Sequence, residues 1–353
     1  MTRLILHIGP GKCGSTTIQR LCAASKGAFN QSVGFHFLDP TEFVDLDTGT
    51  VSSSRISALD DLIKKTLNDH NVAVISHEFL FQTPQAVGII IQRMMAACSD
   101  VRLIGYARRQ SSLLTSTYSQ WLFRARERLD EISLLLRHKR IEPKLFTGLE
   151  RQFIASIIDD FHSARQLSGY NLLDLWGGYK ALERQAQCTD FRIGVLPTAA
   201  YSFSLVNDFC KKADLELSVT QTLEEIVNPK FNSGLVASLN AAVLAGEAEL
   251  HPHQGNDEIL ALSQKLPDFA QPRPEFLDLL CAYTDAYFSD GNKALVERYE
   301  LFDSYFSVKT SLSKDELLDA INEEQRYRMH NPNLISEYYA QISQAIKVAQ
   351  QPN

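Results

Sequence analysis

The chain has 353 residues, with 42 acidic and 35 basic side chains and a net charge of −7. This acidic balance argues against a general nucleic-acid-binding protein, which usually carries a basic excess, but it allows an anionic ligand in a local pocket. The hydrophobic fraction of 44% and the charged fraction of 22% are typical of a soluble globular protein with a sizeable core.

The six cysteines are scattered along the chain, and no Cys-x-x-Cys pair occurs. Neither a zinc ribbon nor a thioredoxin-type motif is therefore indicated, and a reduced, cytoplasmic setting is expected. The apolar run at residues 4–8 is too short for the core of a secretion signal, and charged residues interrupt the longer apolar region at 86–106. We therefore expect no transmembrane segment.

Short apolar runs rich in β-branched residues predict four buried strands, and helical patterns separate them. The strands are expected at residues 4–8, 72–76, 101–106 and 191–196. The helices are expected at residues 55–69, 84–98 and 111–127. Strands that alternate with helices predict an α/β fold, in which a P-loop-like parallel β-sheet is flanked by helices.

The chain after about residue 130 is expected to be mostly helical, apart from the strand near residue 191. Residues 251–274 contain four of the twelve prolines, which predicts an irregular connection there. Residues 313–349 are polar and follow a helical pattern. The C-terminal half is thus expected to be mostly helical.

The turn after the first expected strand reads IGPGKCGSTT, residues 8–17. Ligands of parallel α/β sheets bind at the carboxyl ends of the strands, where this turn lies. Its glycines allow the backbone to approach an anion closely, and the N-terminus of the next helix offers free N–H groups. Lys12 adds a positive charge, and Ser15, Thr16 and Thr17 add hydroxyl donors. This combination favours a phosphate-binding loop over a glycine-rich turn without a ligand.

The loop differs from two well-known phosphate cradles. A Walker A loop has its lysine directly after the last glycine, but Ser15 follows Gly14 here, which disfavours a magnesium-dependent nucleotide triphosphatase or kinase. A tyrosine-phosphatase cradle has an arginine six residues after its cysteine. That count from Cys13 reaches Gln19, and Arg20 comes one residue too late.

The segment HIGPGKCGSTTIQ, residues 7–19, resembles the 5′-phosphosulfate loop of sulfotransferases that use 3′-phosphoadenosine 5′-phosphosulfate (PAPS). In that family a lysine is followed by a hydroxyl residue, a glycine and further hydroxyl residues. The matching positions, with one more hydroxyl beyond them, are Lys12, Gly14, Ser15, Thr16 and then Thr17. Cys13 departs from the pattern, because the family usually has threonine or serine at this position.

A second segment, RLIGYARRQSSLLTSTYSQW, resembles the 3′-phosphate motif of the same family. In that motif an arginine at the end of a strand is followed eight residues later by a serine, and often by a tyrosine two residues further. Arg108, Ser116 and Tyr118 have this spacing. An arginine fork and a hydroxyl can bind one phosphate together. Alone, Arg108 and Arg109 would more simply be solvated or paired with carboxylates.

The resemblance extends over most of residues 3–300, since the stretches 170–217, 228–235 and 292–299 also look like bacterial members. It implies a bacterial, carbohydrate-type sulfotransferase with PAPS as co-substrate and no metal. The acceptor would be a hydroxyl or amine of a glycan or glycolipid, and not a nucleic-acid polymer. The family likeness implies a single domain over residues 1–353, with a cofactor-binding α/β core at 1–200. A mainly helical extension would pack on that core from about 201 to 353.

Sulfuryl transfer needs a base for the acceptor proton and a cation for the charge that builds up on the leaving phosphate. Lys12 is the expected cation because it sits beside the 5′-phosphate in the family. The second expected strand is followed by His77 and Glu78. Glycan sulfotransferases are thought to use a glutamate there, whereas the small-phenol branch uses a histidine. Glu78 is the first candidate for the base and His77 is the alternative.

Cys13 lies at a helix N-terminus beside Lys12, which predicts a lowered thiol pKa, although a small residue that replaces threonine is the simpler interpretation. Four aromatic residues are candidates for stacking on adenine or sugar, but their helical spacing is more typical of core positions: Trp121, Phe123, Trp176 and Tyr179. Two alternatives to the sulfotransferase stay open. One is a nucleotide-dependent kinase of related P-loop fold, and the other is an inactive nucleotide-binding scaffold.

Overall fold

The computed structural model describes residues 2–23, 29–39, 42, 52–120, 124–162, 172–187, 190–198, 202–217, 231–248, 256–308 and 312–351. The chain forms two compact units that alternate along the sequence. Unit 1 comprises Met1–Arg109, Ala164–Asn228 and Asp290–Ser307. Unit 2 comprises Gln110–Ser163, Pro229–Ser289 and Val308–Asn353. The single-domain description stays a prediction, and the two units are described separately.

Unit 1 is built on a parallel sheet of five strands in the order β2-β3-β1-β4-β5. The strands in chain order are β1 (Arg3–Ile8), β2 (Val33–Phe37), β3 (Val72–Ser76), β4 (Val101–Ala107) and β5 (Asp190–Val195). The four expected strands are all present, and the predicted α/β class with a parallel sheet flanked by helices is confirmed. β2 was not predicted, because it is an edge strand whose second half is partly exposed and which lacks a continuous apolar run.

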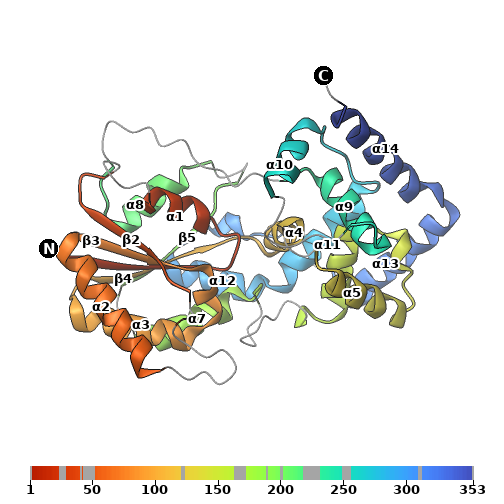
Figure 1. Ribbon diagram of the computed structural model, residues 1–353. Coiled ribbons are helices and arrows are strands. Elements are labelled where there is room, and N and C mark those ends of the chain that lie inside the picture. Colours follow the sequence, from red (N-terminus) through yellow and green to blue (C-terminus); the bar gives the residue numbers. More distant parts are fainter. Residues whose placement is uncertain are drawn as a thin grey trace. The chain divides into compact units, whose positions relative to one another are not determined.

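Helices cover both faces of this sheet (Figure 1). On one face α1 packs against α8. On the other face α3 packs against both α2 and α7. The helices of unit 1 are α1 (Ser15–Ala23), α2 (Ser53–Asp69), α3 (Pro84–Ala97), α7 (Leu175–Ala186), α8 (Leu205–Ala213) and α12 (Ser289–Tyr299). Because both faces are covered, the central strands are buried throughout, as parallel strands usually are.

The strand register brings three chain segments to one edge of the sheet. His7 of β1 lies opposite Ser76 of β3, and Ile8 lies opposite Gly105 of β4. The phosphate-loop candidate therefore leaves the sheet beside the segment that follows β3 and the segment that follows β4. The fold thus brings Lys12, Glu78 and Arg108 to the same edge of the sheet.

Unit 2 is helical throughout its described part. Its helices are α4 (Gln110–Gln120), α5 (Arg126–His138), α6 (Gly148–Ile158), α9 (Ser233–Ala245), α10 (Asn256–Lys265), α11 (Pro274–Tyr287), α13 (Lys314–His330) and α14 (Asn333–Ala349). The mostly helical C-terminal half is confirmed. The packing of α6 against α4, α5, α9 and α11 makes α6 the centre of this unit.

Two local predictions in this part of the chain were wrong in their bounds or type, and a third is confirmed. The helix expected at 111–127 ends at Gln120, and α5 begins at Arg126. The expected irregular connection at 251–274 contains α10, because its prolines flank the helix rather than interrupt it. The helical pattern at 313–349 is confirmed as two helices, α13 and α14, which are separated before Pro332 because proline restricts the residue before it and offers no N–H group.

A buried ion network holds the centre of unit 2. The Arg328 guanidinium donates two hydrogen bonds of 2.8 Å to the Glu150 carboxylate and one of 2.5 Å to Glu324. It also lies over the rings of Phe146 and Phe276, at 5.0 and 5.5 Å from their centroids. Since the arginine is 1% exposed, both carboxylates offset the cost of burying its charge. Arg328, Glu150 and Glu324 therefore stabilise the interior of unit 2.

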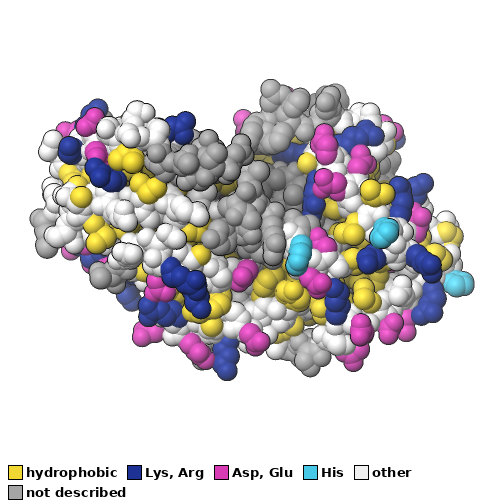
Figure 2. All heavy atoms as spheres, turned by 90° about the horizontal axis from the view of Figure 1, so that it is seen from below, with side chains coloured by type: hydrophobic (Ala, Val, Ile, Leu, Met, Phe, Trp, Pro, Cys, Tyr) yellow, Lys and Arg dark blue, Asp and Glu magenta, His cyan; other side chains and the backbone are white. Residues whose placement is uncertain are grey.

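Charged side chains of both signs are mixed on the surface. On the face seen in Figure 2, lysines and arginines of the described residues are interspersed with aspartates and glutamates. None of the helices in the described ranges combines the length and the hydropathy that crossing a membrane requires.

Candidate functional site

The loop between β1 and α1 adopts a compact turn around Lys12 and Gly14. Both residues have left-handed backbone conformations, with φ of 70° and 81°. The Cys13 N–H donates to the Pro10 carbonyl, and the Gly14 carbonyl accepts from Thr17. The N-terminus of α1 follows this turn directly and carries the positive end of the helix dipole. This loop therefore has the backbone geometry of an anion cradle.

Gly14 is required for this turn, and we expect Gly14→Ala to destabilise the protein. An added Cβ would lie 2.6 Å from Leu205 and 2.8 Å from Leu196. The left-handed conformation alone costs a residue with a Cβ about 1–2 kcal/mol, and the two contacts add to that cost. Urea unfolding followed by circular dichroism should show a lower midpoint with an unchanged slope. An unchanged midpoint would mean that the loop adopts another conformation.

Lys12 lies among charged neighbours that affect its ionisation. Burial lowers the pKa of Lys12 to about 8, the Glu78 carboxylate opposes this shift, and the positive charge of Arg108 adds to it. Arg108 also donates from Nη1 to the Lys12 carbonyl oxygen at 3.2 Å. The structure thus brings two cations and one carboxylate, predicted separately from three motifs, to the same loop.

Glu78 is joined directly to the loop. It begins the short 3-10 helix η2 (Glu78–Gln82) after β3, and it is partly exposed. The Ser15 hydroxyl donates to Glu78 Oε2 at 2.8 Å. This bond fixes one carboxylate oxygen against the start of α1. The sequence motif gave Ser15 a phosphate-binding role, and its contact with Glu78 was not foreseen.

His77 has a different environment from its neighbour. Its ring is 4% exposed and packs against Phe37 and Phe79, with centroid distances of 4.4 and 5.2 Å. Its Nδ1 accepts from the Phe79 N–H at 3.0 Å and so caps η2. Burial lowers its pKa, although nearby acidic residues oppose the shift. A histidine that caps a helix and stacks between aromatic rings is held in place by structural contacts.

The expectation of a lowered thiol pKa at Cys13 was wrong. The side chain is 1% exposed, and burial raises its pKa to about 12, although Arg108 has the opposite effect. Burial therefore outweighs the helix N-terminus and the neighbouring cations. The structure instead agrees with the simpler interpretation, in which Cys13 is a small core residue in place of threonine.

The other predicted residues fall into three groups. Thr16 and Thr17 lie in the first turn of α1, where Thr16 is partly exposed and Thr17 is buried. Ser116 is partly exposed on α4, which belongs to unit 2, so its pairing with Arg108 stays a prediction.

Among the aromatic candidates, Tyr179 is fully buried and donates to the Tyr106 carbonyl. Trp176 lies under the Lys180 ammonium group. Trp121 and Phe123 lie outside the described residues.

Two features of the site were not predicted. Arg109 donates to the carbonyl group of Tyr305, the last residue of the 3-10 helix η6 (Asp303–Tyr305), and to that of Ser307 just after it. Cys13 and Arg108 both influence the pKa of Tyr305, which burial raises to about 12. This ring therefore lies near the loop although it is almost 300 residues away in sequence. No local signal marks it, because only the folded chain brings it there.

A buried polar network lies under the loop. The Ser76 hydroxyl is hydrogen-bonded to His7 Nδ1 at 2.8 Å and to Gln19 Nε2 at 3.1 Å. Burial lowers the pKa of His7 to about 3, so this ring is neutral at physiological pH. The network ties β1, β3 and α1 together directly below the segment that carries Glu78. Within the described ranges, no group of three or more His, Cys, Asp or Glu side chains is arranged to hold a metal ion.

Neither a protein-family model nor a curated protein matches the chain. Among solved structures, a sulfotransferase from Alicyclobacillus acidocaldarius is similar over 87% of this chain and 99% of that chain. The TM-score is 0.37 and the sequence identity is 10%. The fold assignment accordingly rests on the strand order and helices of the chain itself.

Proposed function

We propose that the protein is a sulfotransferase that moves a sulfuryl group from PAPS to a hydroxyl or amine of a glycan or glycolipid. The observation that carries this proposal is the meeting of Lys12, Glu78 and Arg108 at one loop of unit 1. Lys12 and Arg108 come from two separate sequence motifs, and Glu78 follows the strand that lies beside β1. The anion-cradle geometry of the loop gives the same interpretation a physical basis.

The donor has two phosphate groups for the chain to bind. The first-turn N–H groups of α1, the hydroxyl of Thr16 and the ammonium group of Lys12 would hold the 5′-phosphosulfate. Arg108 would bind the 3′-phosphate, with Ser116 as a further donor that the sequence motif predicts. A charge on Lys12 at neutral pH agrees with this role, since its pKa of about 8 keeps most of the side chain protonated.

The reaction breaks the bond from sulfur to the 5′-phosphate oxygen and forms a bond from sulfur to the acceptor oxygen. Glu78 would take the proton of the acceptor hydroxyl as the new bond forms. Lys12 would stabilise the negative charge that appears on the leaving phosphate oxygen. The Ser15 hydrogen bond holds one oxygen of Glu78 and leaves the other for the acceptor. His77 is the less suitable base, because its Nδ1 already accepts from the backbone and its ring is buried.

The experiment that tests this proposal is transfer of ³⁵S-labelled sulfuryl from PAPS to a panel of saccharides and glycolipids. Labelled product is expected with at least one acceptor when magnesium is absent and EDTA is present. Formation of phosphorylated product from γ-labelled magnesium ATP, with no sulfated product, would instead establish the kinase. Lack of both products, together with no binding of 3′-phosphoadenosine 5′-phosphate, would favour the inactive scaffold.

A further inference from the structure

A second cavity, in unit 2, has a charge arrangement that the proposed function does not use. Its volume is about 790 Å³, within the usual range of about 300–1,000 Å³ for small-molecule sites. It is lined by side chains from α5, α6, α9 and α14 and from the 3-10 helix η4 (Pro143–Leu145). Three consecutive elements, α5, η4 and α6, thus form one hollow together with α9 and α14, which are distant from them in sequence.

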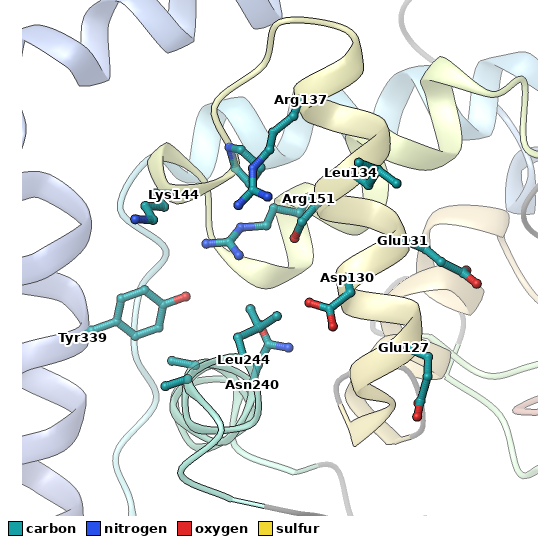
Figure 3. Close-up of a pocket in the computed structure, with 14 residues that line it drawn as sticks. Glu127, Asp130, Glu131, Leu134, Arg137, Lys144, Arg151, Asn240, Leu244 and Tyr339 are labelled. Atoms are coloured by element: carbon teal, nitrogen blue, oxygen red, sulfur yellow. The ribbon is translucent and has the colours of Figure 1, made fainter.

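Three cations meet in this cavity. Figure 3 shows the guanidinium groups of Arg137 and Arg151 turned toward one space, with the Tyr339 hydroxyl directed at it and Lys144 at the rim of the cavity. The Arg151 Nε donates to the Phe146 carbonyl at 2.9 Å, which fixes the guanidinium and leaves its outer nitrogens directed at the space. Among the residues that the structure describes, none of the three cations forms an ion pair with a carboxylate.

The acidic residues around the cavity do not neutralise these cations. Asp130 and Glu131 pair with Arg126 and Arg128, arginines of their own helix that do not line the cavity. The carboxylates of Glu127 and Glu131 point away from the space between the cations (Figure 3). The contrast with Arg328 is direct, since that arginine has two carboxylate partners in the same unit. The basic half of the cavity is therefore free to hold an anion.

The opposite wall offers a group suited to neutral hydroxyls. It contains the Asp130 carboxylate, which Figure 3 shows facing the cavity. Leu134 and Leu244 add apolar surface to the same cavity. Burial raises the pKa of Tyr339, so its hydroxyl stays protonated and can donate to an anion. An anionic end, several hydroxyls and short apolar faces together describe a sugar with an acidic group.

We propose that this cavity is a binding site for a small saccharide that carries a carboxylate or phosphate group. Arg137, Lys144, Arg151 and Tyr339 bind the anionic group, while Asp130 accepts hydrogen bonds from hydroxyls. The site lies wholly within unit 2 and does not depend on PAPS or on the loop of unit 1. It therefore goes beyond the proposed sulfuryl transfer, and each can fail without the other.

The test is isothermal titration calorimetry on the full chain, without nucleotide, using two matched pairs of disaccharides. The pairs are cellobiouronate with cellobiose, and trehalose 6-phosphate with trehalose. At least one acidic member is expected to bind at least tenfold more tightly than its neutral partner. The double variant R137Q/K144Q is expected to weaken that binding by about tenfold or more, because two charge-assisted contacts are lost. Both positions are exposed, so the fold should tolerate the change.

The matched control is Lys139→Gln, which removes an exposed cation at the end of the same helix without altering the cavity. It should bind as the wild type does, while Arg151→Gln should weaken binding as the double variant does. Equal binding of acidic and neutral sugars would overturn the proposal. So would undiminished binding in R137Q/K144Q, or inorganic phosphate that binds as tightly as the best acidic sugar. Absence of binding by all four disaccharides at about 10 mM would overturn it as well, because a dissociation constant above that concentration corresponds to very weak binding.

Discussion

Glu78→Gln is expected to lower kcat for sulfuryl transfer by about 10² to 10⁴-fold, the usual contribution of a positioned general base. The amide keeps an oxygen that can accept from the Ser15 hydroxyl, so the loop contact should survive. It cannot take the acceptor proton at neutral pH. Affinity for 3′-phosphoadenosine 5′-phosphate should change little, because the proposed role of Glu78 concerns the acceptor and not the nucleotide. Steady-state kinetics with an acceptor from the saccharide panel and calorimetry with the bisphosphate measure the two effects.

The matched variant is His77→Asn, which preserves an acceptor for the Phe79 N–H while it removes the imidazole. Its kcat should stay within a few-fold of the wild-type value. A large loss of kcat in His77→Asn, with little loss in Glu78→Gln, would mean that His77 and not Glu78 is the general base. Equal small effects in both variants would mean that the base lies elsewhere.

Lys12→Met is expected to lower kcat by about 10² to 10³-fold, comparable with the loss of one preorganised donor at a developing oxyanion. Methionine keeps most of the length and volume of the side chain but has no charge. Its φ of 70° is no easier for methionine than for lysine, so the turn itself should be affected little. Rates measured by single turnover would show whether the loss lies in the chemical step, as this role requires. An unchanged chemical step with a raised KM would assign Lys12 to donor binding alone.

The pKa of Lys12 gives this role a pH signature. Because the pKa is lowered to about 8, the side chain is charged below pH 8 and loses its charge as the pH rises through that value. The wild-type kcat/KM, which reports the free enzyme, should therefore fall above about pH 8. Lys12→Arg stays charged over this range and should abolish the fall, even if its rate is lower. A wild-type profile that is flat from pH 7 to 9.5 would contradict the assignment.

The features that were predictable from sequence are those written in short, local patterns. Four strands could be predicted because each contains a short run rich in apolar and β-branched residues, and the loop at Lys12 because glycines, a lysine and hydroxyls are adjacent. The exposed half of β2 breaks that pattern, and the edge position that explains it is visible only in the sheet. The parallel register then placed Glu78 and Arg108 near the loop, since both follow strands next to β1.

The remaining features depend on contacts between distant segments or on the balance of opposing effects. The contact of Arg109 with the backbone of Tyr305 joins residues almost 200 positions apart, which no local pattern encodes. The thiol of Cys13 was misjudged because sequence shows the neighbouring charge of Lys12 but not the depth of burial, and burial dominates. The cavity of unit 2 was missed for the same reason, since Arg137 and Tyr339 come together only in the folded protein.

The central claim is that the loop of unit 1, with Arg108 beside it, binds a nucleotide with separate 3′- and 5′-phosphate groups. The most direct measurement is a thermal shift with 3′-phosphoadenosine 5′-phosphate, 5′-AMP and magnesium ATP on wild type, Arg108→Ala and the exposed control Arg20→Ala. At a hundred times its dissociation constant, the bisphosphate should add about 2.7 kcal/mol to the free energy of unfolding. We predict a clear rise with the bisphosphate alone, kept in Arg20→Ala and lost in Arg108→Ala. A response to magnesium ATP without one to the bisphosphate would contradict the account.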